Sequence, residues 1–160
     1  LQRDGCCLEE VWQYNPQPIA GNEGQDPPPG NAQIQALGFR VQNYKQLSPT
    51  SVPDIKNELT KGRCVAFSVP VFNSWLGSSW VSYTGNITMP IPNEIRAGGH
   101  AMCLVGYMDL PNPGLGGGRF ILRNSWGENW GINNQFGVPG YGTIPYAYIA
   151  KFGSEAYSIL

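Results

Sequence analysis

Short blocks of alternating or continuous apolar residues run along this chain, and several of them predict strands. The segment Arg63–Val71 is apolar and β-branched, which predicts a strand in the core. Three later segments have the same character and also predict strands: His100–Tyr107, Phe120–Asn124 and Tyr141–Pro145. A weaker pattern over Phe39–Tyr44 predicts one more strand. The second half of the chain therefore predicts a mainly antiparallel sheet.

Helical spacing of apolar residues is limited to short segments. Apolar residues three and four apart predict a helix over Cys6–Tyr14, and Ala32–Leu37 predicts one helical turn. A third helix is predicted to begin after Ser51, which can cap it because Asp54 follows three residues later, and to end at Gly62. Short helices followed by strands predict an α+β fold.

Three segments have no periodic pattern. Residues 15–30 are rich in proline and glycine and predict a surface loop. Trp75–Tyr83 is aromatic and irregular, and Asp109–Gly118 predicts a flexible hairpin loop or flap. The 160 residues suffice for one compact domain with a core of its own.

Composition excludes several classes of function. The formal net charge is −1 and charged residues are only 13% of the chain, so we expect neither nucleic acid nor an anionic membrane as a partner. The apolar runs are too short to cross a bilayer, which predicts a soluble protein with no transmembrane segment and leaves its compartment unknown. A single histidine and scattered cysteines lack metal-ligand spacing, so neither a metal nor another cofactor is expected.

Two short motifs hold the candidate chemistry. Gly98-Gly99-His100-Ala101 contains the only histidine of the chain, and Asn124-Ser125-Trp126-Gly127 follows, with Trp130-Gly131 behind it. A histidine that acts as a general base needs a second hydrogen bond to fix its ring, and an asparagine carboxamide can accept that bond without adding a charge. An indole beside the pair can shield the bond from water. The motifs therefore predict a histidine–asparagine pair on neighbouring strands.

These motifs, in this order, resemble the papain-like cysteine peptidases. The resemblance extends from the helix at 53–61 to Gly140-Tyr141-Gly142 and implies a helical left domain and a β-barrel right domain. It implies that residues 1–47 are a remnant of the left domain with a loop. Residues 48–160 would form the right domain, which carries His100 and Asn124.

The resemblance also implies a role for each residue of the motifs. His100 would take the proton of a cysteine thiol, and Asn124 would hold the imidazole in plane. Trp126 would cover the bond between them, and Trp130 would form an apolar wall on the leaving-group side. Gly98 and Gly99 would leave room for a bulky apolar side chain of a peptide or protein substrate.

The nucleophile is the missing part of this pattern. Cys6 and Cys7 lie upstream, but Cys7 precedes His100 by only 93 residues, and Pro16 ends their predicted helix too soon for the long central helix of the family. The adjoining Glu9–Tyr14 run resembles a later segment of compact bacterial members. Cys64 and Cys103 lie in predicted strands, which favours buried structural thiols. We therefore expect the catalytic cysteine on an upstream segment or on a separate, complementary chain.

Two alternatives to a peptidase remain open on the sequence. The chain could be a catalytically inactive relative whose cleft binds peptides without cutting them. It could also be a related acyl-transfer enzyme, such as a peptide ligase or a transglutaminase-like protein. Those enzymes usually pair their histidine with aspartate, and Asn124 in its Asn-Ser-Trp-Gly setting argues against the transglutaminase-like protein.

Overall fold

The computed structural model describes residues 1–14 and 27–160 of the chain. These residues form two compact units, one of Leu1–Tyr44 with Leu160 and one of Lys45–Ile159. The second unit contains both motifs of the predicted site. The expected division between residues 47 and 48 into left and right domains stays a prediction.

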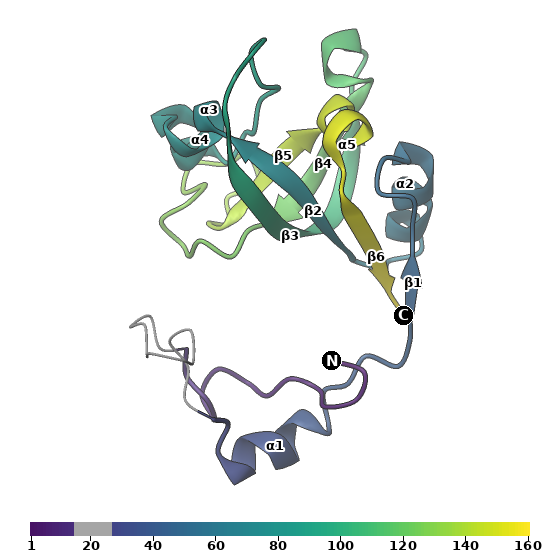
Figure 1. Ribbon diagram of the computed structural model, residues 1–160, viewed down its shortest axis with the longest axis vertical. Coiled ribbons are helices and arrows are strands. Elements are labelled where there is room, and N and C mark those ends of the chain that lie inside the picture. The colour runs from purple at the N-terminus through teal and green to yellow at the C-terminus, as the bar shows by residue number, and fades with distance from the viewer. Residues whose placement is uncertain (15–26) are drawn as a thin grey trace. The chain divides into compact units, whose positions relative to one another are not determined.

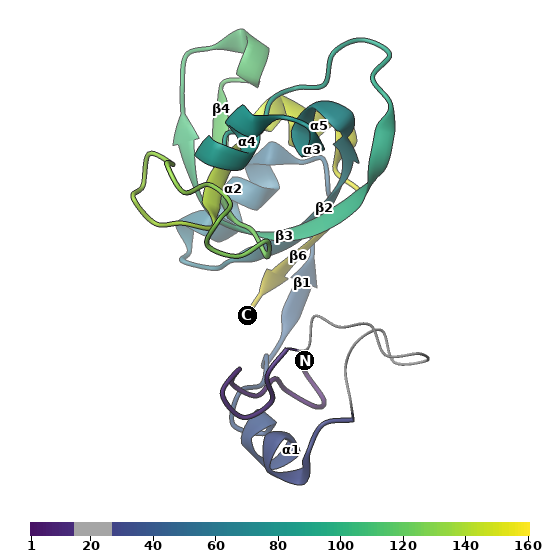
Figure 2. The ribbon, with the colours of Figure 1, turned by 90° about the vertical axis from the view of Figure 1, so that its left-hand side faces the viewer.

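A six-stranded sheet forms the body of the second unit (Figure 1). Its strands follow one another in the order β1-β6-β2-β3-β4-β5, and the pairs β6–β2, β2–β3, β3–β4 and β4–β5 are antiparallel. The strands span Tyr44–Gln46 (β1), Val65–Phe72 (β2), Arg96–Asp109 (β3), Gly118–Arg123 (β4), Tyr141–Pro145 (β5) and Glu155–Ile159 (β6). Figure 2 shows β3 as a long, curved strand that runs across this sheet.

The helices are short, as the sequence predicts. They span Gly30–Ala36 (α1), Val52–Thr60 (α2), Asn73–Leu76 (α3), Ser79–Thr84 (α4) and Tyr146–Phe152 (α5). One 3-10 turn, Pro113–Leu115, lies in the predicted loop between β3 and β4. The expected start of α2 is confirmed, because the Ser51 side chain accepts a hydrogen bond of 3.3 Å from the backbone N–H of Asp54.

The core lies on one face of the sheet. Along β2, the residues Val65, Phe67 and Val69 are buried, whereas Ala66 between them is exposed. Fully buried residues of β3, β4 and β5 join them, namely Leu104, Phe120, Leu122 and Ile144. The strands predicted in this part of the chain are therefore confirmed, within a few residues at their ends.

The predicted helix over Cys6–Tyr14 is wrong. The structure has only a turn there, with the N–H groups of Val11 and Trp12 donating to the carbonyl of Leu8. The reason is that a side-chain acceptor takes a backbone N–H that a helix would need. The Tyr14 N–H donates to the Glu9 carboxylate at 2.8 Å instead of to a helical carbonyl.

Other elements also differ from prediction. The irregular aromatic segment 75–83 contains parts of α3 and α4, and the strand predicted over 39–44 is limited to β1, which starts at Tyr44. Neither α5 nor β6 was among the predicted elements. Residues 15–26 of the predicted loop lie outside the described residues. Among the described residues, no helix is long and apolar enough to cross a membrane.

Candidate functional site

His100 and Asn124 contact each other directly. The His100 Nε2 atom lies 2.8 Å from the Asn124 Oδ1 atom, the distance of a good hydrogen bond. His100 lies on β3, and Asn124 is the first residue after the neighbouring β4. Asn124 is fixed there because its backbone N–H donates to the Gly140 carbonyl at 2.8 Å, and the residue is buried. The predicted juxtaposition on adjoining strands is present.

This contact determines which nitrogen of the imidazole stays available. The carboxamide oxygen can only accept, so Nε2 must carry the proton and donate it. Oδ1 also accepts from the Ser125 N–H at 2.8 Å, which orients the carboxamide. Among the described residues, His100 Nδ1 has no hydrogen-bond partner. An imidazole with its other nitrogen bound in this way can use Nδ1 as a base.

The two tryptophans of the motifs lie close to His100 and to each other. The Trp126 ring stacks on the His100 ring, with centroids 4.7 Å apart and an interplanar angle of 27°. Trp130 packs edge-on against Trp126 at 6.1 Å and is almost fully buried, whereas Trp126 is 39% exposed. One face of the imidazole is therefore covered by an indole that still borders solvent.

Close backbone packing holds the tryptophan-bearing loop. Gly85 ends α4 and Gly131 follows Trp130, and both have positive φ, +68° and +63°. A Cβ atom at either position would collide with the carbonyl oxygen of Tyr141, at the start of β5. In addition, the Gly131 N–H donates to the carbonyl of Ser82 at 2.7 Å. The loop that carries Trp126 and Trp130 is thus attached to α4 and to β5.

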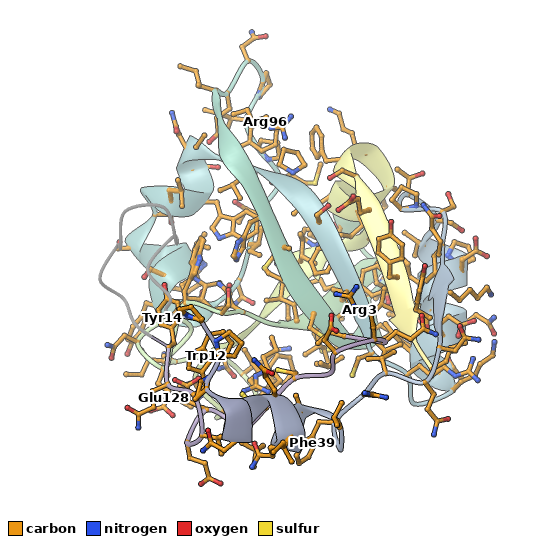
Figure 3. All side chains as sticks on the ribbon, turned by 60° about the horizontal axis from the view of Figure 1, so that its bottom comes forward. Arg3, Trp12, Tyr14, Phe39, Arg96 and Glu128 are labelled. Carbon is orange, nitrogen blue, oxygen red and sulfur yellow. The ribbon has the colours of Figure 1, made fainter. Side chains whose placement is uncertain are left out.

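Gly98 and Gly99 precede His100 on β3, opposite Val71 and Pro70 of β2. Figure 3 shows Arg96 at the start of this strand, and its Nε donates to the Gly98 carbonyl at 3.1 Å. A Cβ atom at Gly98 would meet no atom within 4 Å. There is therefore open space at this position, two residues before the histidine.

The cysteines of the second unit do not face His100. Side chains alternate along β3, so Cys103, three residues after His100, points to the opposite face of the sheet. Cys64 precedes the buried Val65 and lies on that same opposite face. It is exposed, so the expectation of a buried Cys64 thiol is wrong, and Cys103 is half-buried. Burial, and then the nearby Cys64 thiol, raise the pKa of Cys103 to about 11, which disfavours a thiolate at neutral pH.

One aromatic residue near His100 was not singled out by the motifs. Trp75 of α3 is 3% exposed, and its ring lies edge-on to the His100 ring at 6.2 Å. The sequence marks its segment only as aromatic and irregular, which carries no information on spatial position. Among the residues described, no cluster of histidine, cysteine, aspartate or glutamate could hold a metal ion.

Comparison with known families identifies the class of protein. The sequence profile of the papain family of cysteine proteases matches residues 3–141. The chain therefore belongs to the papain family of cysteine proteases. The resemblance deduced from the two motifs, and the papain-like α+β fold, are confirmed.

The relatives extend this result. The chain is 31% identical over 157 residues to the uncharacterized peptidase C1-like protein L477 of Acanthamoeba polyphaga mimivirus, covering 94% of this chain and 45% of that protein. Among solved structures, xylellain, a cysteine protease from Xylella fastidiosa, is similar with a TM-score of 0.76 and 27% identity. That similarity covers 99% of this chain and 57% of xylellain.

A more distant structure shows the fold alone. Procathepsin L2 from the larval midgut of Tenebrio molitor has a TM-score of 0.60 at 22% identity, over 99% of this chain and 44% of that one. The chain thus spans about half the length of the relatives that it matches.

Proposed function

We propose that this chain supplies the histidine–asparagine part of a cysteine peptidase that hydrolyses peptide bonds through a thioester. The observation that carries the proposal is the 2.8 Å contact between His100 Nε2 and Asn124 Oδ1 beneath the stacked Trp126 ring. His100 acts as the general base and then as the general acid. Asn124 holds its ring, and Trp126 and Trp130 form the wall beside it.

The proposed reaction uses the free nitrogen of His100. Nδ1 takes the proton of a cysteine thiol, and the resulting thiolate attacks the carbonyl carbon of the scissile peptide bond. The imidazolium then gives its proton to the leaving amine as the carbon–nitrogen bond breaks and a thioester remains. Water attacks the thioester, His100 takes one of its protons, and the acid and the thiol are released.

The nucleophile belongs to an upstream segment or a complementary chain. Cys64 and Cys103 both lie on the face of the sheet opposite to His100, and the raised pKa of Cys103 disfavours its thiolate. Cys6 and Cys7 lie in the other compact unit, in an irregular segment rather than on a helix, whereas in this family the nucleophile opens a long helix. A peptide or protein is the proposed substrate.

A non-catalytic peptide-binding role is the second candidate. It is favoured by the same placement of Cys64 and Cys103, because a chain without a nucleophile at His100 cannot form a thioester. The intact pair of His100 and Asn124 favours the peptidase, since a binding surface has no chemical need for an oriented imidazole with a free nitrogen.

Labelling with an electrophilic thiol inhibitor, followed by intact-mass measurement, separates the candidates. The natural protein, purified together with any chain that accompanies it, is incubated with the inhibitor, and each polypeptide is weighed. One label on an upstream cysteine or on a second polypeptide supports the peptidase. Uptake by Cys7 would instead place the nucleophile in this chain. No uptake at all, together with peptide binding that survives His100→Ala, would establish the binding role.

A further inference from the structure

Trp75 belongs to a continuous group of aromatic rings around His100. Its ring lies 6.2 Å from His100 at 75° and 6.0 Å from Trp126 at 50°. Because Trp126 also stacks on His100, the three rings contact one another pairwise. Aromatic pairs at these separations and tilts attract each other beyond the effect of their buried area. Trp75 therefore restrains both the imidazole and the indole that covers it.

The Trp75 ring also packs against a second buried aromatic residue. Tyr148 of α5 is fully buried and packs edge-on against Trp75 at 6.2 Å and 87°. The Tyr148 hydroxyl donates to the carbonyl of Pro70 on β2 at 2.7 Å. Pro70 lies opposite Gly99, the residue before His100. Trp75 therefore contacts His100 on β3 directly, and it contacts β2 through Tyr148. A movement of Trp75 would disturb both contacts.

The backbone of α3 is also held by specific contacts. The Glu94 carboxylate accepts hydrogen bonds from the backbone N–H and the hydroxyl of Ser74, the residue before Trp75. The same carboxylate accepts from the Ile91 N–H at 3.0 Å. A four-residue helix has little stability of its own, so these bonds determine where Trp75 lies.

The indole N–H of Trp75 makes this position unusual. The Nε1 atom is buried and has no hydrogen-bond partner among the described residues. An unpaired buried donor opposes folding, and a phenylalanine would fill the core without that donor. Hydrogen bonding by the N–H therefore does not account for a tryptophan at this position. The contacts of its large ring with both His100 and Trp126 do account for it.

We propose that Trp75 is a positioning residue, which keeps the His100 ring in the orientation that donates Nε2–H to Asn124 and leaves Nδ1 free. This inference rests on the proposed function, in which His100 is the general base. Its geometric content is that three groups, Asn124, Trp126 and Trp75, restrain one imidazole from three directions. Loss of the Trp75 ring lets the imidazole rotate about its side-chain bonds, so the bond to Asn124 opens more often.

The single histidine of the chain gives a direct test. The exchange of the His100 Nε2 proton with water is measured by NMR on the natural protein, purified with any chain that accompanies it and labelled with ¹⁵N-histidine. The His100 signal is assigned as the one that His100→Ala removes. Trp75→Leu should accelerate exchange about tenfold, because a lost aromatic pair can shift an equilibrium by that order. Trp75→Phe, which restores a ring, should stay within about threefold of the parent chain. Trp80→Leu on the neighbouring α4, where the side chain is 62% exposed, is the matched control and should change nothing.

Two further variants keep the inference falsifiable. If Trp75→Leu does not fold, Trp75→Met fills more of the space without a ring and should show the same acceleration. Unchanged exchange in a folded Leu or Met variant overturns the role of Trp75. Asn124→Ala should remove the protection altogether. If it does so while the Trp75 variants have no effect, the proposed function stands and only this inference fails. If protection persists in Asn124→Ala, both fail.

In a preparation that hydrolyses peptide, Trp75→Leu should lower kcat and leave KM unchanged, since Trp75 is buried and offers no surface to a substrate. A purely structural role would lower the melting temperature without either change.

Discussion

The pair His100–Asn124 and the cluster around Glu58 are two polar groups of the same compact unit with opposite surroundings. Glu58 of α2 is 99% buried, and its carboxylate accepts from Lys45, Lys61 and Arg63 at 2.9–3.2 Å and from the Ser158 hydroxyl at 3.2 Å. His100 has one side-chain hydrogen bond and three aromatic or amide neighbours.

The comparison separates a structural polar group from a reactive one. The Glu58 oxygens have partners on every side, and Arg63 foremost, then Lys61 and Lys45, hold the pKa of this carboxyl at about 2. Such a group stays charged and has no acceptor left for chemistry. His100 is held by a neutral partner, and its Nδ1 atom has no hydrogen-bond partner in the part of the chain that the structure describes. The number of unused atoms, rather than burial, distinguishes the two.

His100→Ala should have the largest effect of the substitutions that probe this contrast. In a preparation that cleaves peptide, kcat/KM should fall by about a thousandfold or more, because the proton transfer to and from the cysteine is lost. The free energy of unfolding should fall by only about 1 to 3 kcal/mol, from the lost hydrogen bond and the lost ring contacts. Steady-state kinetics and urea unfolding measure the two quantities. A large loss of stability with retained activity would show that His100 is the structural group rather than the reactive one.

Glu58→Gln should have the opposite profile, with reduced stability at pH 7 and unchanged kcat/KM. The Glu58 pKa is lowered from 4.5, so its stabilising effect is complete above pH 4.5 and is lost as the pH falls toward 2. Unfolding free energies of parent and variant should therefore converge over that interval. The control is Glu128→Gln at an exposed glutamate, for which the difference should stay small at every pH. A parent–variant gap that is constant between pH 5 and pH 2 would show that the charge of Glu58 is unimportant.

Asn124→Ala should have an intermediate effect on activity. A misplaced general base costs about a hundredfold, so kcat should fall by about ten- to a hundredfold while KM stays the same. The loss should be smaller than for His100→Ala, because the imidazole remains. Single-turnover kinetics would detect it, and an equal loss in both variants would mean that Asn124 does more than orient the ring.

Gly98→Ala should have the smallest effect. Its Cβ would meet open space, so the free energy of unfolding should change by about 0.5 kcal/mol or less. If Gly98 borders the pocket for a bulky apolar side chain, a peptide library should show a shift toward smaller residues in this variant. Gly85→Ala is the contrasting control, because its positive φ and its contact with the Tyr141 carbonyl make a Cβ costly. A parent protein that already prefers small residues would contradict the predicted pocket.

The sequence predicted the strands of the second unit because alternation and β-branched residues are local signals. The segment around Arg63–Val71 and the strand before Asn124 are examples. It also predicted that His100 and Asn124 meet, since two motifs on neighbouring strands leave few other arrangements.

Other features depended on contacts between distant segments. The Cys6–Tyr14 segment has helical spacing, but Glu9 captures the Tyr14 N–H and Gln35 captures the Leu8 N–H. Trp75 approaches His100 only because Glu94 and Tyr148 hold α3 and its ring in place. Contacts of this kind produce no periodic pattern of apolar residues, so a single sequence does not reveal them.

The central claim is that His100 activates a cysteine thiol, and the rate of thiol alkylation tests it most directly. The second-order rate constant for an electrophilic inhibitor is measured at pH 6 in the natural protein, with any accompanying chain, before and after His100→Ala. We expect one fast-reacting cysteine whose rate falls by about a hundredfold or more in the variant, because the imidazole no longer holds it as a thiolate. Equal rates in the two proteins would contradict the assignment of His100 as the base.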